Sequence, residues 1–132
     1  MARLAIKGHP TRGNEVIEIL EMLGGKREGV FLGNVIDVGY YIDSNGDIDY
    51  GYANLLDNTI IYTLKEFLEK FPYKVGDKVK FNEYTDTYTI SKMMWDTKLD
   101  DVIFQFTESG DNWWHKDGLQ LCKKSRTYEK KN

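Results

Sequence analysis

The chain has 132 residues, of which 41% are hydrophobic, 14% aromatic and 30% charged, and its formal net charge is −3. This composition is typical of a folded globular protein and excludes general disorder. The small negative charge excludes the overall positive field that dominates non-specific nucleic-acid binding. No apolar run reaches the ~18 residues of a membrane span, and a single cysteine excludes an internal disulfide. Because residues 1–7 are also too short for a signal-peptide core, we expect a cytoplasmic protein without a membrane partner.

The first feature along the chain is a glycine-flanked polar loop between a strand and a helix. Weak alternation predicts a strand over residues 3–7, and the loop follows over residues 8–13. Apolar residues recur at helical spacing over residues 15–23, so this segment is predicted to be a helix with one core-facing side. Thr11 is the best N-cap candidate because its hydroxyl can accept a first-turn backbone N–H. The Gly24-Gly25 pair is expected to close the helix.

A β-hairpin is predicted where an Asn45-Gly46 pair separates two β-prone runs, since this pair tolerates the positive φ angles of a two-residue turn. The first of its strands is expected over residues 34–42. Acidic residues alternate through the turn, which raises the alternative of a calcium loop. An EF-hand loop needs glycine at position 6 and an acidic residue at position 12, and here the latter position is Asn54. The pattern therefore favours an exposed acidic hairpin.

The second helix has a complete set of start signals. Thr63 and Glu66 have the spacing of a capping box, and Tyr62 can pack on Phe67 as a hydrophobic staple. A brief strand is predicted just before it, over residues 59–62. Pro72 ends the helix and is the best internal boundary, because a strand-rich segment follows.

Residues 75–121 contain four or five short predicted strands, a density that favours a small, strongly bent barrel over an open sheet. The predicted fold class is therefore α+β, with two short helices and a β-hairpin followed by a C-terminal small antiparallel β-barrel. We predict a helix-and-hairpin part over residues 1–72, the barrel over 73–122 and a basic tail over 123–132. One continuous sheet flanked by two helices is the alternative. The basic residues of the tail are Lys123, Lys124, Arg126, Lys130 and Lys131.

Two resemblances bear on this organisation. The order Val-Gly-Asp-Lys-Val, a strand ending in Met-Met-Trp, a Phe-rich strand, a Trp-bearing strand and Gly-Leu-Gln-Leu resembles small barrels of the Tudor and KOW type. Residues 7–25, residues 40–46 and residues 63–78 together resemble a set of short uncharacterised proteins of gut Bacteroidales bacteria and crAss-like phages. The second resemblance implies a bacterial or phage cytoplasm and brings no assigned activity or site residues.

The loop before the first helix is one candidate site. Free N–H groups at a helix start, together with a guanidinium and an imidazole, can converge on a phosphate or carboxylate. The loop matches neither established glycine-rich phosphate motif. In the alternative interpretation Gly8 and Pro10 shape a turn and Thr11 caps the helix. Arg12 then pairs with an acidic residue such as Glu15 or Glu18. The candidate ligand-binding residues are His9, Thr11, Arg12 and Gly13.

A set of aromatic residues in the second half is the other candidate site, because clustered rings on a small barrel can stack on bases or cage a cation. Adjacent tryptophans on a strand point to opposite faces, so at most one of Trp113 and Trp114 is expected in the core. A role in the core or between subdomains is the alternative. The set consists of Trp95, Trp113, Trp114, Tyr84 and Tyr88.

Nothing in the sequence has the pattern of a catalytic, metal or cofactor site. The two histidines, His9 and His115, lie in different segments, and Cys122 has no base beside it in the sequence. We therefore expect a non-enzymatic binding or interaction protein of a phage or bacterial mobile element, with another protein as the first choice of partner. One alternative is a small anion- or nucleotide-binding protein, sequestering or hydrolytic, that uses loop 8–13. Nucleic-acid binding through the barrel and the tail is another.

Overall fold

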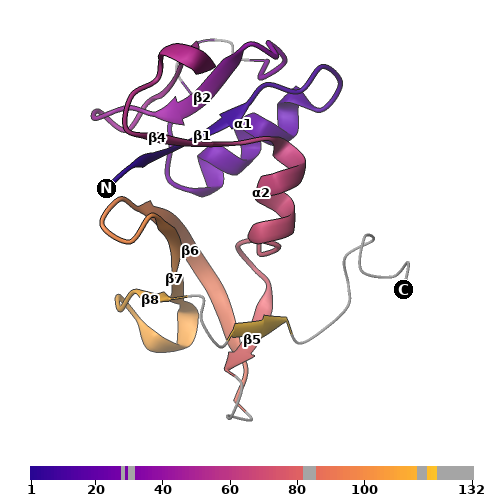
Figure 1. The fold of residues 1–132 in the computed structure, drawn as a ribbon. Helices are drawn as coiled ribbons and strands as arrows, with labels where there is room; N and C mark the ends of the chain where they lie inside the picture. Colours follow the sequence, from indigo (N-terminus) through magenta and orange to yellow (C-terminus); the bar gives the residue numbers. More distant parts are fainter. Residues whose placement is uncertain (28, 30–31, 82–85, 116–118, 122–132) are drawn as a thin grey trace. The chain divides into compact units, whose positions relative to one another are not determined.

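The structure is a computed structural model, and it describes residues 1–27, 29, 32–81, 86–115 and 119–121. The chain is an α+β protein, as predicted, with two α-helices and two sheets in these residues (Figure 1). Its backbone contacts divide it into two units. The first is Met1–Pro72 with Met94–Val102, and the second is Tyr73–Met93 with Ile103–Asn132. The sequence-based division at residues 72 and 122 stays a prediction.

The first unit is built on a four-stranded sheet in the order β3-β2-β1-β4. The central strand β1 pairs antiparallel with β2 and parallel with β4, and β2 pairs antiparallel with β3. The strands predicted over residues 3–7 and 59–62 are confirmed, whereas the one expected over 34–42 begins only at Val38. The strands are β1 (Arg3–Lys7), β2 (Val38–Ile42), β3 (Ile48–Tyr52) and β4 (Thr59–Tyr62).

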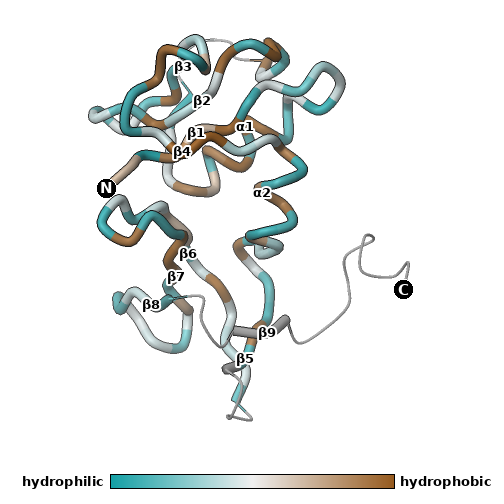
Figure 2. Tube along the Cα trace, in the orientation of Figure 1, coloured by the Kyte–Doolittle hydropathy of each residue, from teal (hydrophilic) through white to brown (hydrophobic). Residues whose placement is uncertain are grey.

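Helix α1 (Gly13–Met22) covers part of this sheet, next to β2 and β3. Its apolar face is fully buried at Val16 and Ile17, and the hydrophobic stretches of α1 and β1 stand out in Figure 2. The predicted glycine stop is confirmed. Gly24 has a φ of +104°, its N–H donates to the Glu21 carbonyl (3.0 Å), and the Gly25 N–H donates to the Leu20 carbonyl (2.8 Å). These two bonds make a Schellman ending, which only a residue tolerant of positive φ permits at low cost.

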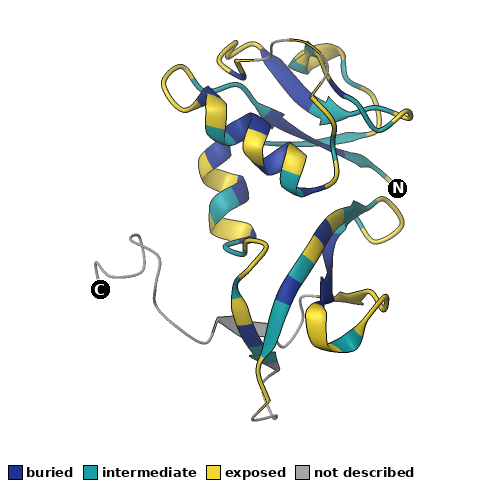
Figure 3. Cartoon of the chain, turned by 180° about the vertical axis from the view of Figure 1, so that it is seen from behind, coloured by how far each residue is buried: buried dark blue, intermediate teal, exposed yellow. Residues whose placement is uncertain are grey.

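Helix α2 (Leu64–Lys70) starts as the sequence predicts. The Glu66 N–H donates to the Thr63 hydroxyl (3.1 Å), and the Thr63 N–H donates to the Glu66 carboxylate (2.8 Å), which is a complete capping box. The staple is also present, since the ring centroids of Tyr62 and Phe67 lie 6.1 Å apart. Both helices carry alternating buried and exposed residues along their length (Figure 3).

The predicted β2–β3 hairpin is confirmed, but its turn is longer than two residues. The Asp43 N–H donates to the Asp47 carbonyl (2.8 Å) and the Gly46 N–H donates to the Asp43 carbonyl (2.9 Å), so three residues form the loop. Within this loop, which the structure describes in full, only Gly46 has a positive φ, +85°. The Asp43 carboxylate also accepts the N–H groups of Asn45 and Asp47 (2.9 and 3.0 Å). By accepting these two N–H groups of the loop, the Asp43 carboxylate stabilises the three-residue turn.

The second sheet has the order β8-β7-β6-β5-β9 and is curled. The predicted small β-barrel is confirmed only in part: within the described residues the sheet is curled but not closed, because β8 and β9 are its two edges and do not pair. The strands are β5 (Lys78–Phe81), β6 (Tyr88–Asp96), β7 (Asp101–Phe106), β8 (Trp114–His115) and β9 (Leu119–Leu121); the short 3₁₀ turns are η1 (Ala53–Leu55) and η2 (Thr107–Ser109).

The core of the second unit is aromatic. Phe104 and Phe106 are fully buried on β7, with ring centroids 6.4 Å apart. The ring of Tyr73 meets Phe104 edge-on at 5.3 Å. Outside this core, the Glu108 carboxylate accepts the N–H and the hydroxyl of Thr89 (2.7 and 3.1 Å) and so connects η2 to the start of β6. The hydrogen bond from the Thr89 backbone is the main cause that lowers the pKa of Glu108.

We predict that Thr63→Ala lowers the free energy of unfolding by about 1 kcal/mol, because it removes the hydroxyl that accepts the Glu66 N–H. Urea denaturation followed by circular dichroism measures the change. The matched control is Thr97→Ala at an exposed turn position, which we expect to stay within about 0.5 kcal/mol of the wild type. Equal losses in the two variants would contradict a stabilising capping box.

A second prediction concerns acid. Because the folded-state pKa of Glu108 is lowered, its contribution to stability is complete above the ordinary carboxyl pKa of about 4.3 and is lost as the pH falls through the folded value. We expect the wild type to lose more stability than Glu108→Gln between about pH 5 and about pH 3. The difference is small, since solvent screens this exposed carboxylate. Denaturation curves across that range test it, and parallel pH profiles would refute it.

Candidate functional site

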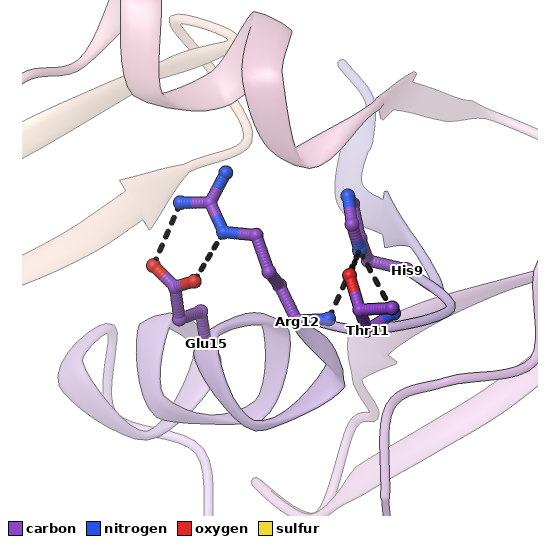
Figure 4. Close-up of polar contacts among 4 residues, drawn as sticks. All are labelled: His9, Thr11, Arg12 and Glu15. Carbon is purple, nitrogen blue, oxygen red and sulfur yellow. Dashed lines mark hydrogen bonds and ion pairs between the residues drawn. The ribbon is translucent and has the colours of Figure 1, made fainter.

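His9 is turned back onto the start of α1. Its Nδ1 accepts the backbone N–H groups of Thr11 (3.2 Å) and Arg12 (2.9 Å) (Figure 4). Because both backbone groups are donors, this ring nitrogen is unprotonated and the proton of the neutral ring is on Nε2. The imidazole thus accepts hydrogen bonds from N–H groups at the helix start, as the side chain of a cap residue normally does.

The predicted N-cap, Thr11, is wrong. Arg12 is the N-cap residue, and its side chain makes no capping hydrogen bond to the helix. The Thr11 hydroxyl lies 3.5 Å from His9 Nδ1 instead of on a first-turn amide. Since the helix begins at Gly13, Thr11 is one residue too early to reach the amides that an N-cap hydroxyl serves.

The guanidinium of Arg12 is engaged by a carboxylate of the same helix. Its Nε and Nη2 donate to the two oxygens of Glu15, with 2.8 Å between Nη2 and Oε1 (Figure 4). The hydrogen bond that Arg12 donates to Glu15 is the main cause that raises the pKa of Arg12, so the ion pair is present at all ordinary pH values. An incoming anion would therefore compete with Glu15 for the same donor fork.

Gly8 and Gly13 lie where another part of the backbone passes very close. A Cβ atom on Gly8 would stand 2.1 Å from the Val35 carbonyl oxygen, and one on Gly13 would stand 2.0 Å from the Leu32 carbonyl oxygen. The His9 N–H donates to the carbonyl of Gly33 in the same passing segment (3.0 Å). These glycines therefore make room for residues 32–35. Anion binding by His9, Thr11, Arg12 and Gly13 stays a prediction, although the contacts of these residues are internal to the fold.

The aromatic set is divided between the two units. Trp95 belongs to the first unit, where its Nε1 donates to the Ala2 carbonyl (2.8 Å) and its ring meets Phe71 edge-on at 6.2 Å. Tyr88 belongs to the second unit and packs on the Phe106 ring at 5.6 Å. Tyr84 lies outside the described residues. The five residues are therefore not shown to form one surface.

Neither Trp113 nor Trp114 is in the core, which agrees with the expectation that at most one of them is. Their exposed fractions are 39% and 40%. Only Trp114 is in a strand, the two-residue edge strand β8, so the alternation rule does not apply to the pair. The Trp114 Nε1 donates to the Ser109 hydroxyl (3.2 Å). Both rings are accessible from the outside, and the core of this unit is made by other residues.

A further surface was missed by the sequence analysis. Half of the large hydrophobic residues that the structure finds exposed lie between residues 32 and 55 of the first unit. The available signal was the run Val35-Ile36 in a loop and the alternation along β3 that continues from the buried Ile48 to two tyrosines. We name this surface the apolar corner; it consists of Leu32, Val35, Ile36, Tyr50, Tyr52 and Leu55.

Strand pairing and side-chain contacts join the loop that carries Val35 and Ile36 to strand β3. Tyr52 is the ladder partner of Val38, which continues the loop that carries Val35 and Ile36. The Val35 N–H donates to the hydroxyl of Tyr40 (3.3 Å), whose ring lies 5.8 Å from that of Tyr50. The loop and strand β3 thus expose their apolar side chains on neighbouring parts of the same unit.

Two absences hold for the part of the chain that the structure describes. No three histidine, cysteine, aspartate or glutamate side chains gather there as a metal site would require. No helix there has the length and apolar character to cross a membrane. Comparisons with protein-family models, with curated proteins and with solved structures give no match.

We predict that His9→Ala destabilises the protein by about 1 kcal/mol, because two N–H groups at the start of α1 lose their acceptor. His9→Asn keeps a side-chain acceptor and should lose less. The control is His115→Ala, which removes an exposed histidine from the other unit. Thermal and urea unfolding measure all three variants. If His9→Ala and His115→Ala are equally stable, the capping role of His9 is wrong.

Proposed function

We propose that this protein is a non-enzymatic binding protein that captures another protein through the apolar corner. The observation that carries the proposal is the exposure of large apolar side chains from two neighbouring segments of one unit. Tyr52 is 62% exposed and Leu55 is 70% exposed, and Val35 and Ile36 are exposed beside them. Exposed apolar residues that gather in one place mark interaction surfaces more often than scattered ones do.

The kind of residue in the apolar corner supports a protein partner. Tyrosine is enriched in protein interfaces because it offers a large rigid contact area and a hydroxyl for hydrogen bonding. Two of its residues, Tyr50 and Tyr52, lie on β3, an outer strand of the described sheet. From the sequence resemblance, we propose a bacterial or phage cytoplasm as the setting, and a phage or mobile element as the origin.

A second candidate function is binding of single-stranded nucleic acid by the curled sheet, whose small-barrel resemblance we keep as part of this proposal. The observation in its favour is the accessibility of both Trp113 and Trp114, because bases stack on exposed rings. The neighbouring described residues Glu108 and Asp111 are acidic, which disfavours a phosphate backbone. The basic tail that would offset them lies outside the described residues. We therefore rank it below protein binding.

Site-specific photo-cross-linking in the host cell tests the proposed function. A photoreactive amino acid at position 52 should trap one defined polypeptide, and excess unmodified protein should compete the product away. The matched control places the same amino acid at Lys65, an exposed position on α2. The double variant Tyr52→Ser with Leu55→Ser should weaken competition by at least about tenfold, as expected for the loss of two large interface side chains. The same products at positions 52 and 65, or no competed product, would refute it.

A further inference from the structure

A shallow groove of about 440 Å³ lies on the first unit, outside the apolar corner and the loop before α1. It is formed by the end of β4 and the helix that follows directly from it (Figure 1). Ile61 and Tyr62 both line it, although adjacent strand residues point to opposite faces of a sheet. The groove therefore runs along the edge of β4 and not over one face. Its lining residues are Ile61, Tyr62, Glu66, Glu69 and Lys70.

The backbone of β4 is available at this edge. Within the described sheet, β4 is an outer strand with β1 on one side only. The Arg3 N–H donates to the Asn58 carbonyl (2.9 Å), and Arg3 is the parallel partner of Thr59. Alternate residues of a parallel ladder direct their backbone groups to the same side, so Ile60 faces β1. The N–H and C=O of Ile61 consequently point away from β1, toward the outer edge of the sheet, where Ile61 lines the groove.

The electrostatics of the groove are negative. Glu69 and Glu66 are both exposed residues of its lining, and the Glu66 carboxylate also accepts the Thr63 N–H of the capping box. Burial is the main cause that raises the pKa of Tyr62, and the nearby carboxylates of Asp101, Asp100 and Glu66 raise it further. The one cation in the lining, Lys70, has its Nζ over the Phe71 ring, 5.9 Å from the centroid. A ligand in this groove thus meets more negative than positive charge.

We propose that this groove binds an extended, basic segment of a partner polypeptide, which adds to the free edge of β4 as a further strand. The backbone of the segment bonds to the N–H and C=O of Ile61, and its lysine or arginine side chains reach Glu69 and Glu66. Strand addition of this kind takes its affinity from main-chain hydrogen bonds and its specificity from side chains at alternate positions. The groove is separate from the apolar corner, so this inference does not depend on the function proposed above.

The test uses the full-length protein and two fluorescent octapeptides, one alternating lysine with valine and the other alternating glutamate with valine. Fluorescence anisotropy measures affinity at about 20 mM and about 300 mM salt, since screening separates charge attraction from other contacts. Amide chemical shifts locate the peptide. We expect the lysine peptide to bind, to lose affinity at high salt and to shift the amides of Ile61 and Tyr62. The glutamate peptide should bind at least about tenfold more weakly.

Two variants of the protein separate the charge and backbone contributions. Glu69→Lys should weaken the lysine peptide roughly five- to tenfold, whereas Glu18→Lys makes the same charge change on an exposed face of α1 and should leave binding unchanged. Ile61→Pro removes the outward N–H, which an edge strand tolerates, and should abolish the shifts. If Ile61→Pro does not fold, Glu69→Lys still decides the matter, because its position is exposed.

Several results would overturn the proposal. Equal binding of both peptides, or equal effects of Glu69→Lys and Glu18→Lys, would show that the acidic groove does not select a basic segment. Sedimentation that reveals a dimer dissociated by Ile61→Pro would show that the edge is occupied by a second copy of the chain. The variant Tyr52→Ser should leave peptide affinity unchanged. Its behaviour distinguishes a failure of this groove from a failure of the apolar corner.

Discussion

The pairing of β1 on both of its sides is the constraint on which the rest of the first unit depends. Ala5 and Ile6 are fully buried in this strand, so β1 can occupy only the interior of a sheet. Its antiparallel partner β2 brings the hairpin and the apolar corner to one side. Its parallel partner β4 becomes the opposite edge and leads into α2. The positions of both proposed binding surfaces therefore follow from the pairing of β1 with β2 on one side and with β4 on the other.

The loop that follows β1 has a structural role in the same arrangement. It turns the chain from the sheet into α1 while the backbone of residues 32–35 passes against Gly8 and Gly13. His9 gives its Nδ1 to the amides at the helix start, and Arg12 gives its guanidinium to Glu15. Polar residues that resemble a binding loop in the sequence thus form hydrogen bonds within the protein, as polar groups at a crowded turn usually do.

The two edge strands of the first sheet differ in the groups that lie beside their outward backbone N–H and C=O groups. At β3 the Asp49 carboxylate accepts the N–H of Tyr50 (2.8 Å), which removes one outward donor, and the tyrosine side chains offer contact area instead. At β4, an outer strand of the described sheet, the backbone of Ile61 lies beside Glu66 and Glu69. An unprotected edge is a risk of unwanted strand pairing, and nearby charge is one way to restrict what can pair with it. The acidic groove admits basic segments and repels acidic ones, a form of selection through repulsion.

Local signals in the sequence determined the elements whose physics is local. The capping box at Thr63, the staple on Phe67 and the glycine stop at Gly24 each depend on residues within a few positions of one another, so they could be read without the fold. The close approach at Gly13 and the exposure of the Trp113-Trp114 pair could not, because they depend on how distant segments pack. The contact of His9 Nδ1 with the Thr11 and Arg12 amides is local, but no residue pattern in the sequence indicated it. The open edge of β4 and its acidic wall were likewise decided only by tertiary structure. Which strand lies at an edge follows from long-range pairing, and no periodicity within residues 59–62 encodes that choice.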